Sequence, residues 1–257
     1  MGFSDTGESR RLEVPTAKEV AEPGLFSTSP MLSVREQVVD CRRCPRLVQY
    51  REQVARDKRR EFLEWNYWGR PVPGFGDPDA SLLIVGLAPA AHGGNRTGRV
   101  FTGDRSGDFL YKCLYKTGFA NQPVSKSIDD GLKLNGAYVT AAVKCAPPDN
   151  KPSPVETSNC SSYLAAEIDA LARLTTILCL GQFAFNAVMK TIRNKYKITQ
   201  KTLGFAHGRI LRLGERVPLI VCSYHPSPRN TQTGKLTERM FLSVLRRLSE
   251  QNIDLAI

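Results

Sequence analysis

One segment limits the possible folds more than any other. An apolar run from Ser81 to Val85 leads directly into a loop rich in glycine and proline, which reads GLAPAAHGGNRTGRVFTGD from Gly86 to Asp104. A short apolar run that ends at turn residues is typical of a strand buried on both faces. A glycine-rich loop at the carboxyl end of such a strand is where open α/β sheets bind ligands. By composition alone, the segment could also be an ordinary surface loop.

The remaining elements alternate between apolar strand-like runs and segments with helical spacing. This alternation predicts a three-layer α/β/α fold, with a mostly parallel sheet covered by helices on both faces. Strands are expected at 81–87, 137–143, 176–180, 208–213 and 219–223, helices at 45–65, 106–118, 155–174, 182–190 and 237–251, and a loop at 71–78. We expect the loops 86–104, 145–154 and 224–234 to lie together at one edge of the sheet.

The chain is expected to form one folded domain over residues 31–257. Residues 1–30 are rich in Ser, Glu, Pro and Gly and lack periodicity, which favours a mobile tail. No apolar run reaches the length that crosses a membrane, and the first residues lack the apolar core of a secretory signal. We therefore expect a cytoplasmic protein without a membrane partner, acting as a monomer.

The net charge favours a polyanionic partner. The chain has 36 Lys and Arg residues against 25 Asp and Glu residues, a net charge of +11. The first 30 residues are slightly acidic, so the folded body is more basic than the whole chain. A body this basic often binds nucleic acid, although many basic proteins are simply soluble.

Seven cysteines, an odd number without an export signal, argue against a disulfide framework. Cys41 and Cys44 form a C-x-x-C pair, and Cys145 and Cys160 flank a proline-rich loop. Four thiolates would suit zinc or an iron–sulfur cluster, but the spacing matches neither a zinc ribbon nor a ferredoxin. The close pair could equally be two packed cysteines. Three further cysteines occupy apolar positions and are expected in the core: Cys113, Cys179 and Cys222.

A second distinctive loop, SYHPSPRNT, runs from Ser223 to Thr231 after the last expected strand. Its two prolines fix φ and stiffen the loop. His225 stands at the strand end, where a donor to a ligand would lie, and Arg229 is suited to phosphate contacts. A rigid turn with a capping histidine is the simpler alternative. The chain has only three histidines, and the fact that His92 and His225 both lie on these loops favours a site.

Taken together, these motifs resemble the family 5, or type B, uracil-DNA glycosylases over roughly residues 41–248. The resemblance is carried by GLAPAAHGGNRTGRVFTGDRSG, VKCAPPDNKP and HPSPRNTQTG, in that order, with four cysteines at matching places. It implies a central four-stranded parallel sheet between helices and a 4Fe–4S cluster held by Cys41, Cys44, Cys145 and Cys160. It also implies excision of uracil, and of other deaminated bases such as hypoxanthine and xanthine, from DNA as the first step of base-excision repair.

The resemblance and the chemistry together assign three catalytic residues. Cleavage of an N-glycosidic bond builds positive charge on the sugar and negative charge on the departing base, so a carboxylate and hydrogen-bond donors stabilise the transition state. We assign Asp104 to orient water or to counter the charge on the sugar. His225 is assigned as the donor to a base oxygen, and Asn150 is expected to bind the base or the water.

Four further residues are assigned to substrate binding. A glycosylase must extrude its target nucleotide and hold the base in a pocket, and Phe101 offers an aromatic face for stacking. Backbone N–H groups at Leu87 and Ala88 can donate to the base. Arg229 is expected to enter or brace the gap left in the duplex.

The sequence departs from the wider superfamily at two positions. Several families carry an acidic or amide residue early in the first motif, where this chain has Ala88-Pro89-Ala90. Other families also carry an asparagine on the second strand that binds the uracil edge, where this chain has Ala141. A pocket without that amide loses a discriminating hydrogen bond, which predicts a broad substrate range and makes the acid at Asp104 the central assignment to test.

Two alternatives remain open. A non-catalytic cysteine-metal module that binds nucleic acid would share the basic charge and the four thiolates. A glycosylase relative that traps DNA covalently through its histidine is the third hypothesis, although the chain has no special basic insertion to favour it.

Overall fold

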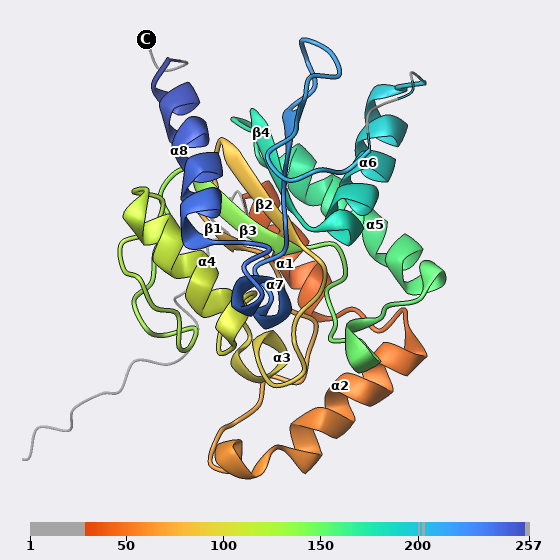
Figure 1. Ribbon diagram of the computed structural model, residues 1–257. Coiled ribbons are helices and arrows are strands. Elements are labelled where there is room, and N and C mark those ends of the chain that lie inside the picture. The colour runs from red at the N-terminus through yellow and green to blue at the C-terminus, as the bar shows by residue number, and fades with distance from the viewer. Residues whose placement is uncertain (1–28, 200, 202–203, 255–257) are drawn as a thin grey trace, which may run out of the picture.

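The computed structural model describes residues 29–199, 201 and 204–254 and places a six-stranded sheet between two layers of helices (Figure 1). The expected tail therefore lies almost wholly outside the described residues. The strands are β1 Phe75–Gly76, β2 Leu82–Gly86, β3 Ala137–Ala141, β4 Thr176–Leu180, β5 Ile210–Leu211 and β6 Leu219–Ser223. The helices are α1 Pro30–Val39, α2 Pro45–Asp57, α3 Gly94–Thr97, α4 Arg105–Lys116, α5 Pro154–Ala170, α6 Gln182–Tyr196, α7 Pro228–Gln232 and α8 Glu238–Asp254, with 3₁₀ turns at Arg60–Phe62 and Pro148–Asn150.

The strand order is β1-β3-β2-β4-β6-β5. The four central strands run parallel, with Val85 opposite Thr140 on one side of β2 and opposite Cys179 on the other. They are the expected parallel core, but two antiparallel edge strands of two residues each widen the sheet. One of them, β1, lies within the expected 71–78 loop, because two paired residues are too few to produce a periodic pattern.

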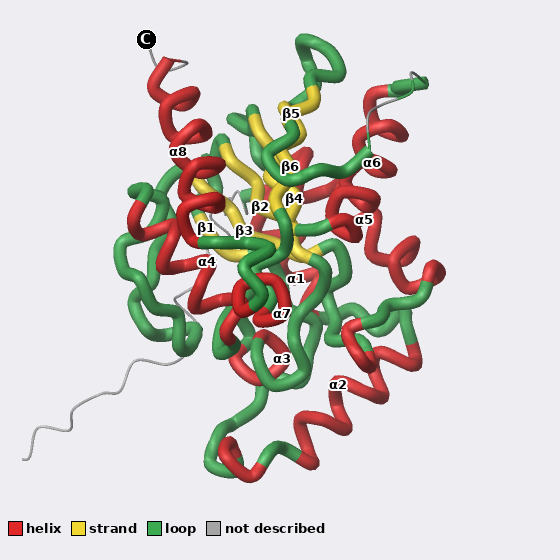
Figure 2. The backbone as a smooth tube through the Cα atoms, viewed as in Figure 1, coloured by secondary structure: helices red, strands yellow, loops and turns green. Residues whose placement is uncertain are grey.

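Helices cover both faces of the sheet, as expected (Figure 2). In β2, Leu82 and Ile84 contribute to one core cluster together with α4 and α8. Leu83 and Val85 contribute to the other cluster together with α1, α5 and α6. Because successive side chains of a strand point to opposite faces, a strand covered on both sides must be apolar throughout.

The order in which strands are added to the sheet reverses at β2. The connection through α4 leads to β3 on one side of β2, and the connection through α5 leads to β4 on the other. Ligands of open α/β sheets bind in the crevice at the carboxyl ends of the strands at such a reversal. The Gly86–Asp104 loop begins at this crevice.

The expected helix at 45–65 is shorter than the apolar spacing suggested. α2 ends at Asp57, and the next residue, Lys58, has a φ of 48°, outside the helical region. Phe62 and Trp65 lie beyond this helix, and both rings pack against Arg96 of α3. The apolar residues Phe62 and Trp65 therefore reflect a tertiary contact with Arg96 and do not extend the helix.

α1 was not expected, although it carries recognisable start signals. The Ser29 side chain accepts a hydrogen bond from the Leu32 backbone N–H (3.3 Å), and Pro30 occupies the first helical position. Met31, Val34 and Val38 form its buried face. Over the part of the chain that the structure covers, no helix is long and apolar enough to cross a membrane.

Candidate active site

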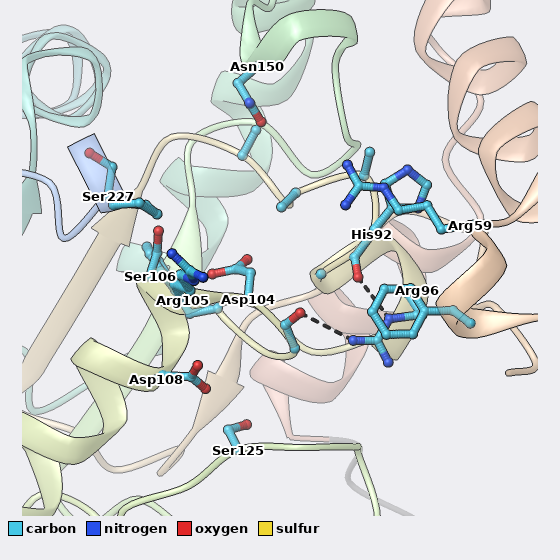
Figure 3. A pocket seen from close by; sticks show the side chains of 18 of the residues that line it. Arg59, His92, Arg96, Asp104, Arg105, Ser106, Asp108, Ser125, Asn150 and Ser227 are labelled. Carbon is cyan, nitrogen blue, oxygen red and sulfur yellow. Dashed lines mark hydrogen bonds between the residues drawn. The ribbon is translucent and has the colours of Figure 1, made fainter. Parts of the chain in front are cut away.

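A large pocket of about 1290 Å³ opens at the carboxyl end of β2. Six of the seven residues predicted to act on the substrate line it: Leu87, Ala88, Phe101, Asp104, Asn150 and His225. Arg229 is not among the lining residues, because it lies on the exposed side of α7, but its neighbours Ser227 and Pro228 are. Figure 3 shows Asn150, Ser227, Ser125 and Arg96 arranged around Asp104. Three loops distant in sequence therefore meet in one pocket, as expected.

Two glycines leave the space that Phe101 occupies. Its φ is 51°, in the left-handed region that non-glycine residues rarely adopt. A Cβ on Gly86 would lie 2.5 Å from the Cζ atom of the Phe101 ring, and a Cβ on Gly107 would lie 1.7 Å from the Phe101 carbonyl oxygen. The Phe101 and His225 ring centroids are 5.8 Å apart. The backbone thus accepts local strain that places an aromatic ring over the end of β2, as often occurs at functional sites.

Asp104 is the N-cap residue of α4. Its Oδ1 accepts a hydrogen bond from the Gly107 backbone N–H (3.0 Å), at the helix end where the dipole favours an anion. Burial raises the pKa of Asp104 above its ordinary value, against the backbone N–H groups of Gly107 and Ser106, which lower it. Asp108 raises the pKa further, and the charge on Arg96 lowers it. The carboxylate is therefore partly desolvated and supported by fixed donors.

His225 follows β6 and is neutral at physiological pH. Burial lowers the pKa of His225 to about 4. The Asn230 side chain donates to the His225 carbonyl oxygen (2.8 Å), which ties the loop to the start of α7. Gly181 has a φ of 92°, and a Cβ there would lie 3.2 Å from the His225 Cβ. A neutral imidazole beside the pocket can donate a hydrogen bond to a base oxygen without adding a charge.

Asn150 ends the short 3₁₀ turn after β3. Both Asp149 (φ 53°) and Asn150 (φ 55°) adopt left-handed backbone conformations. The Asn150 backbone N–H donates to the Pro147 carbonyl oxygen (3.2 Å). Asparagine tolerates this conformation better than most residues do, and here it brings the amide to the pocket rim (Figure 3).

Arg96 is a site residue that the sequence analysis did not identify. Its guanidinium carbon lies 3.9 Å from the centroid of the Phe62 ring and 4.1 Å from that of Trp65. Its side chain also donates to the carbonyl oxygens of His92 (2.8 Å) and Gly103 (3.2 Å) (Figure 3). Arg96 therefore fixes the backbone next to Asp104. The sequence analysis had placed Phe62 and Trp65 in the expected 45–65 helix and so gave no sign of this contact.

The four predicted cluster ligands gather beside the pocket and do not line it. Cys44, Cys145 and Cys160 share one buried apolar cluster, and Cys41 is partly buried beside the neighbouring one. All four are free thiols. Electrostatic interactions link Cys145 with Cys160 and Cys41, and Cys160 with Cys44.

Two observations bear on which metal group these four cysteines could hold. No three His, Cys, Asp or Glu side chains among the described residues are placed to hold one metal ion. A single zinc needs sulfurs about 2.3 Å from a common point, whereas each thiolate of a 4Fe–4S cluster binds a different iron, so the sulfurs lie farther apart. Arg51, only 2% exposed, donates to the Cys145 sulfur (2.9 Å). Arg51 also lies 3.9 Å from the Glu52 carboxylate. A buried cation that donates to a cysteine sulfur suits an anionic, multi-iron centre at these four residues.

The other three cysteines are core residues, as predicted. Cys113, Cys179 and Cys222 are each 0% exposed. Cys113 lies in the core on the α4 and α8 side of the sheet, and the other two lie on the opposite side.

Comparison with known proteins identifies the family of this chain. A model of the uracil DNA glycosylase superfamily matches residues 73–249. The chain is 49% identical over 212 residues to a type-5 uracil-DNA glycosylase of Pyrobaculum aerophilum, covering 82% of this chain and 88% of that protein. It is 48% identical over 206 residues to a type-5 uracil-DNA glycosylase of Thermus thermophilus, covering 80% and 90%.

A more distant relative, a type-4 uracil-DNA glycosylase of Archaeoglobus fulgidus, is 29% identical over 157 residues, covering 61% of this chain and 70% of that protein. Identity is thus much higher to the type-5 proteins and extends over more of the chain. By sequence, this chain belongs to the type-5 group of the uracil DNA glycosylase superfamily.

Proposed function

We propose that the protein is a monofunctional glycosylase that hydrolyses the bond between deoxyribose and uracil in DNA and so initiates base-excision repair. We further propose that it acts as a monomer in the cytoplasm. The observation that carries the proposal is the meeting of Phe101, Asp104 and His225 in one pocket at the carboxyl end of β2. An extruded base in this pocket meets an aromatic ring, a neutral donor and a desolvated carboxylate.

In the proposed reaction, uracil leaves the stack and packs on the Phe101 ring. The bond from C1′ to the base breaks, and its electron pair departs with the base. His225 and the backbone N–H groups of Leu87 and Ala88 donate to the oxygens on which negative charge develops. Asp104 faces the sugar, where it opposes the positive charge and orients the water whose oxygen adds to C1′. The proton that this water loses passes to the departed base, which leaves neutral uracil and an abasic sugar.

The proposed substrate range extends to deaminated purines. Ala141, at the end of β3, is 2% exposed and carries no group that can read the edge of uracil. The only amide assigned to the pocket, Asn150, lies at the rim on a separate turn. Excision measured on oligonucleotides that each carry one uracil, hypoxanthine or xanthine tests this range. Strict selectivity for uracil would contradict the argument from Ala141.

The four clustered cysteines are proposed to hold a 4Fe–4S cluster. When bound, it would link the start of α2, the end of β3 and α5, because Cys41 and Cys44 precede α2, Cys145 follows β3 and Cys160 lies on α5. We expect a brown preparation with equal amounts of iron and sulfide. A colourless protein that contains zinc would refute the cluster and leave the catalytic proposal intact.

The decisive experiment for the activity is Asp104→Asn, with Asp108→Asn as its control. Both carboxylates line the pocket and lie four residues apart at the start of α4, but Asp104 is half-buried and caps the helix through the Gly107 N–H, whereas Asp108 is exposed. Asp104→Asn should lower uracil release from a duplex by orders of magnitude while DNA binding persists, and Asp108→Asn should retain most of the rate. Near-normal release by Asp104→Asn would remove it from the mechanism. Retention of DNA without abasic sites, by the unmodified protein, would favour a binding module instead.

A further inference from the structure

The loop between α4 and β3 closes on itself and reaches the pocket. The Asn121 backbone N–H donates to the Lys133 carbonyl oxygen (3.1 Å), and the Lys133 backbone N–H donates back to the Asn121 side chain (2.8 Å). Ala120 and Leu134 form an isolated β-bridge just outside this pair. Residues 121–133, called the 121–133 loop below, are therefore a compact surface loop whose ends are joined, a form that often has a function.

A buried cation fixes the inside of this loop. Arg99, only 3% exposed, donates to Asp130 (2.8 Å), to the Ser125 hydroxyl (3.0 Å) and to the Ile128 carbonyl oxygen (2.8 Å). The Asp130 carboxylate also accepts from the backbone N–H groups of Lys126 (2.6 Å) and Leu132 (3.0 Å). A buried charge without its partner is costly, so this arrangement has little freedom to open.

The same network joins the loop to the catalytic segment. Arg99 lies two residues before Phe101, and the Thr102 hydroxyl is 2.6 Å from the Ser125 hydroxyl. The 121–133 loop is therefore held in a fixed position relative to the ring that is proposed to stack on the base. Figure 3 shows Ser125 and Ser227 on different sides of Asp104.

The loop presents an apolar side chain and a cation at the pocket. Val124 is 42% exposed, and both Val124 and Lys126 are among the residues that line the pocket. The Gln122 side chain donates to the Val124 carbonyl oxygen (2.9 Å), which holds the backbone there. Valine is stiff about χ1, so a fixed backbone also fixes the direction of its side chain. Ile128 is exposed to a similar degree, at 48%, but does not line the pocket.

We infer that the 121–133 loop is a second DNA-contacting arm, in which Val124 packs against the base next to the extruded nucleotide and Lys126 reaches its phosphate. The inference rests on the proposed function. Extrusion leaves a gap between flat, apolar base faces, and DNA-binding proteins commonly insert apolar side chains at such steps. Lys126 adds charge where a backbone phosphate passes. The arm lies apart from α7, so the gap would be contacted from two sides.

The test compares Val124→Ala with the matched control Ile128→Ala on uracil in a duplex and on uracil in a single strand. Only a duplex has a stack to open, so Val124→Ala should slow duplex excision about tenfold and single-strand excision less than about twofold. Val124→Ile keeps a branched apolar side chain and should retain the duplex rate of the unmodified protein. Ile128→Ala should change neither the duplex rate nor the single-strand rate. Equal losses on both substrates, or equal losses in the two alanine variants, would overturn the inference.

A second measurement does not require catalysis. A 2-aminopurine placed beside uracil in the duplex becomes more fluorescent when it is unstacked. The unmodified protein should raise this emission on binding, Val124→Ala should raise it much less at saturating protein, and Ile128→Ala should match the unmodified protein. Unchanged emission with Val124→Ala would refute contact at this step. Failure of the proposed function would look different, because the unmodified protein would then release no uracil from either substrate.

Discussion

The contact between Gly86 and the Phe101 ring allows a direct test of how the pocket holds its base. In a Gly86→Ala variant, the new Cβ would lie 2.5 Å from Cζ and 2.6 Å from Cε2 of that ring. Carbon atoms in good contact are about 3.5 Å apart, so the ring must move by about 1 Å. Because Gly86 lies beneath the ring at the end of β2, the movement carries the ring into the space proposed for the base.

The expected effect follows from the stacking that is lost. Stacking of a base on an aromatic side chain contributes about 1–3 kcal/mol. At about 1.4 kcal/mol for each factor of ten, complete loss lowers the rate of uracil release by about 5- to 150-fold. The added methyl group should also cost about 1–3 kcal/mol of stability through overpacking. Gly86 does not require a left-handed φ, so no further backbone strain is expected.

Single-turnover excision at saturating protein measures the rate, and urea unfolding measures the stability. Gly86→Ala should have almost no additional effect on excision in a Phe101→Ala background, because the atoms that clash are then absent. Gly204→Ala is the control, since no described atom lies within 4 Å of the site of its new Cβ. A rate equal to that of the unmodified protein, or the same loss with and without the ring, would refute Phe101 as the stacking surface.

Three further predictions concern charge. Because the pKa of His225 is about 4 and not near 6.5, protonation of this imidazole should cause no acid limb near pH 6.5, and activity should fall on the acid side as Asp104, whose pKa burial raises, gains its proton; the pH profile of single-turnover excision checks this. Lys144→Met should lower the free energy of unfolding in urea by about 3–5 kcal/mol, because it leaves the Glu167 carboxylate, 2.7 Å away and 1% exposed, without its cation. Arg51→Met removes the donor to Cys145 beside the proposed iron–sulfur cluster and should weaken retention of that cluster's iron against a chelator about 10- to 100-fold, as is typical when a partner of a metal ligand is lost.

Each charge prediction has a control or a contradicting outcome. An acid limb near pH 6.5 that disappears in a His225→Gln variant would mean that the imidazole is not buried in the neutral form. Lys195→Met, which breaks a surface ion pair with Asp169, should change stability by less than about 1 kcal/mol. Arg42→Met removes an exposed arginine close to the same cysteines and should leave iron retention unchanged; a loss equal to that of Arg51→Met would indicate a general charge effect.

The sequence alone determined the parallel core and the positions of its loops. Continuous apolar runs such as Leu82–Val85 are typical of strands covered on both faces, and the turn residues after them mark where ligand-binding loops begin. The same reasoning placed Cys113, Cys179 and Cys222 in the core. The motifs around Asp104 and His225 were likewise visible, because function there depends on residue types that local patterns do not otherwise require.

Only the tertiary structure determined which distant residues complete the site. The aromatic residues Phe62 and Trp65 looked like the continuation of a helix, yet they pack on Arg96, which fixes the backbone beside Asp104. Arg99 gave no sign in the sequence that it holds the 121–133 loop against the pocket. Periodicity reports which face of an element is buried, but not which element covers it. Contacts between separate loops depend on how the sheet brings those loops together, and no local pattern contains that information.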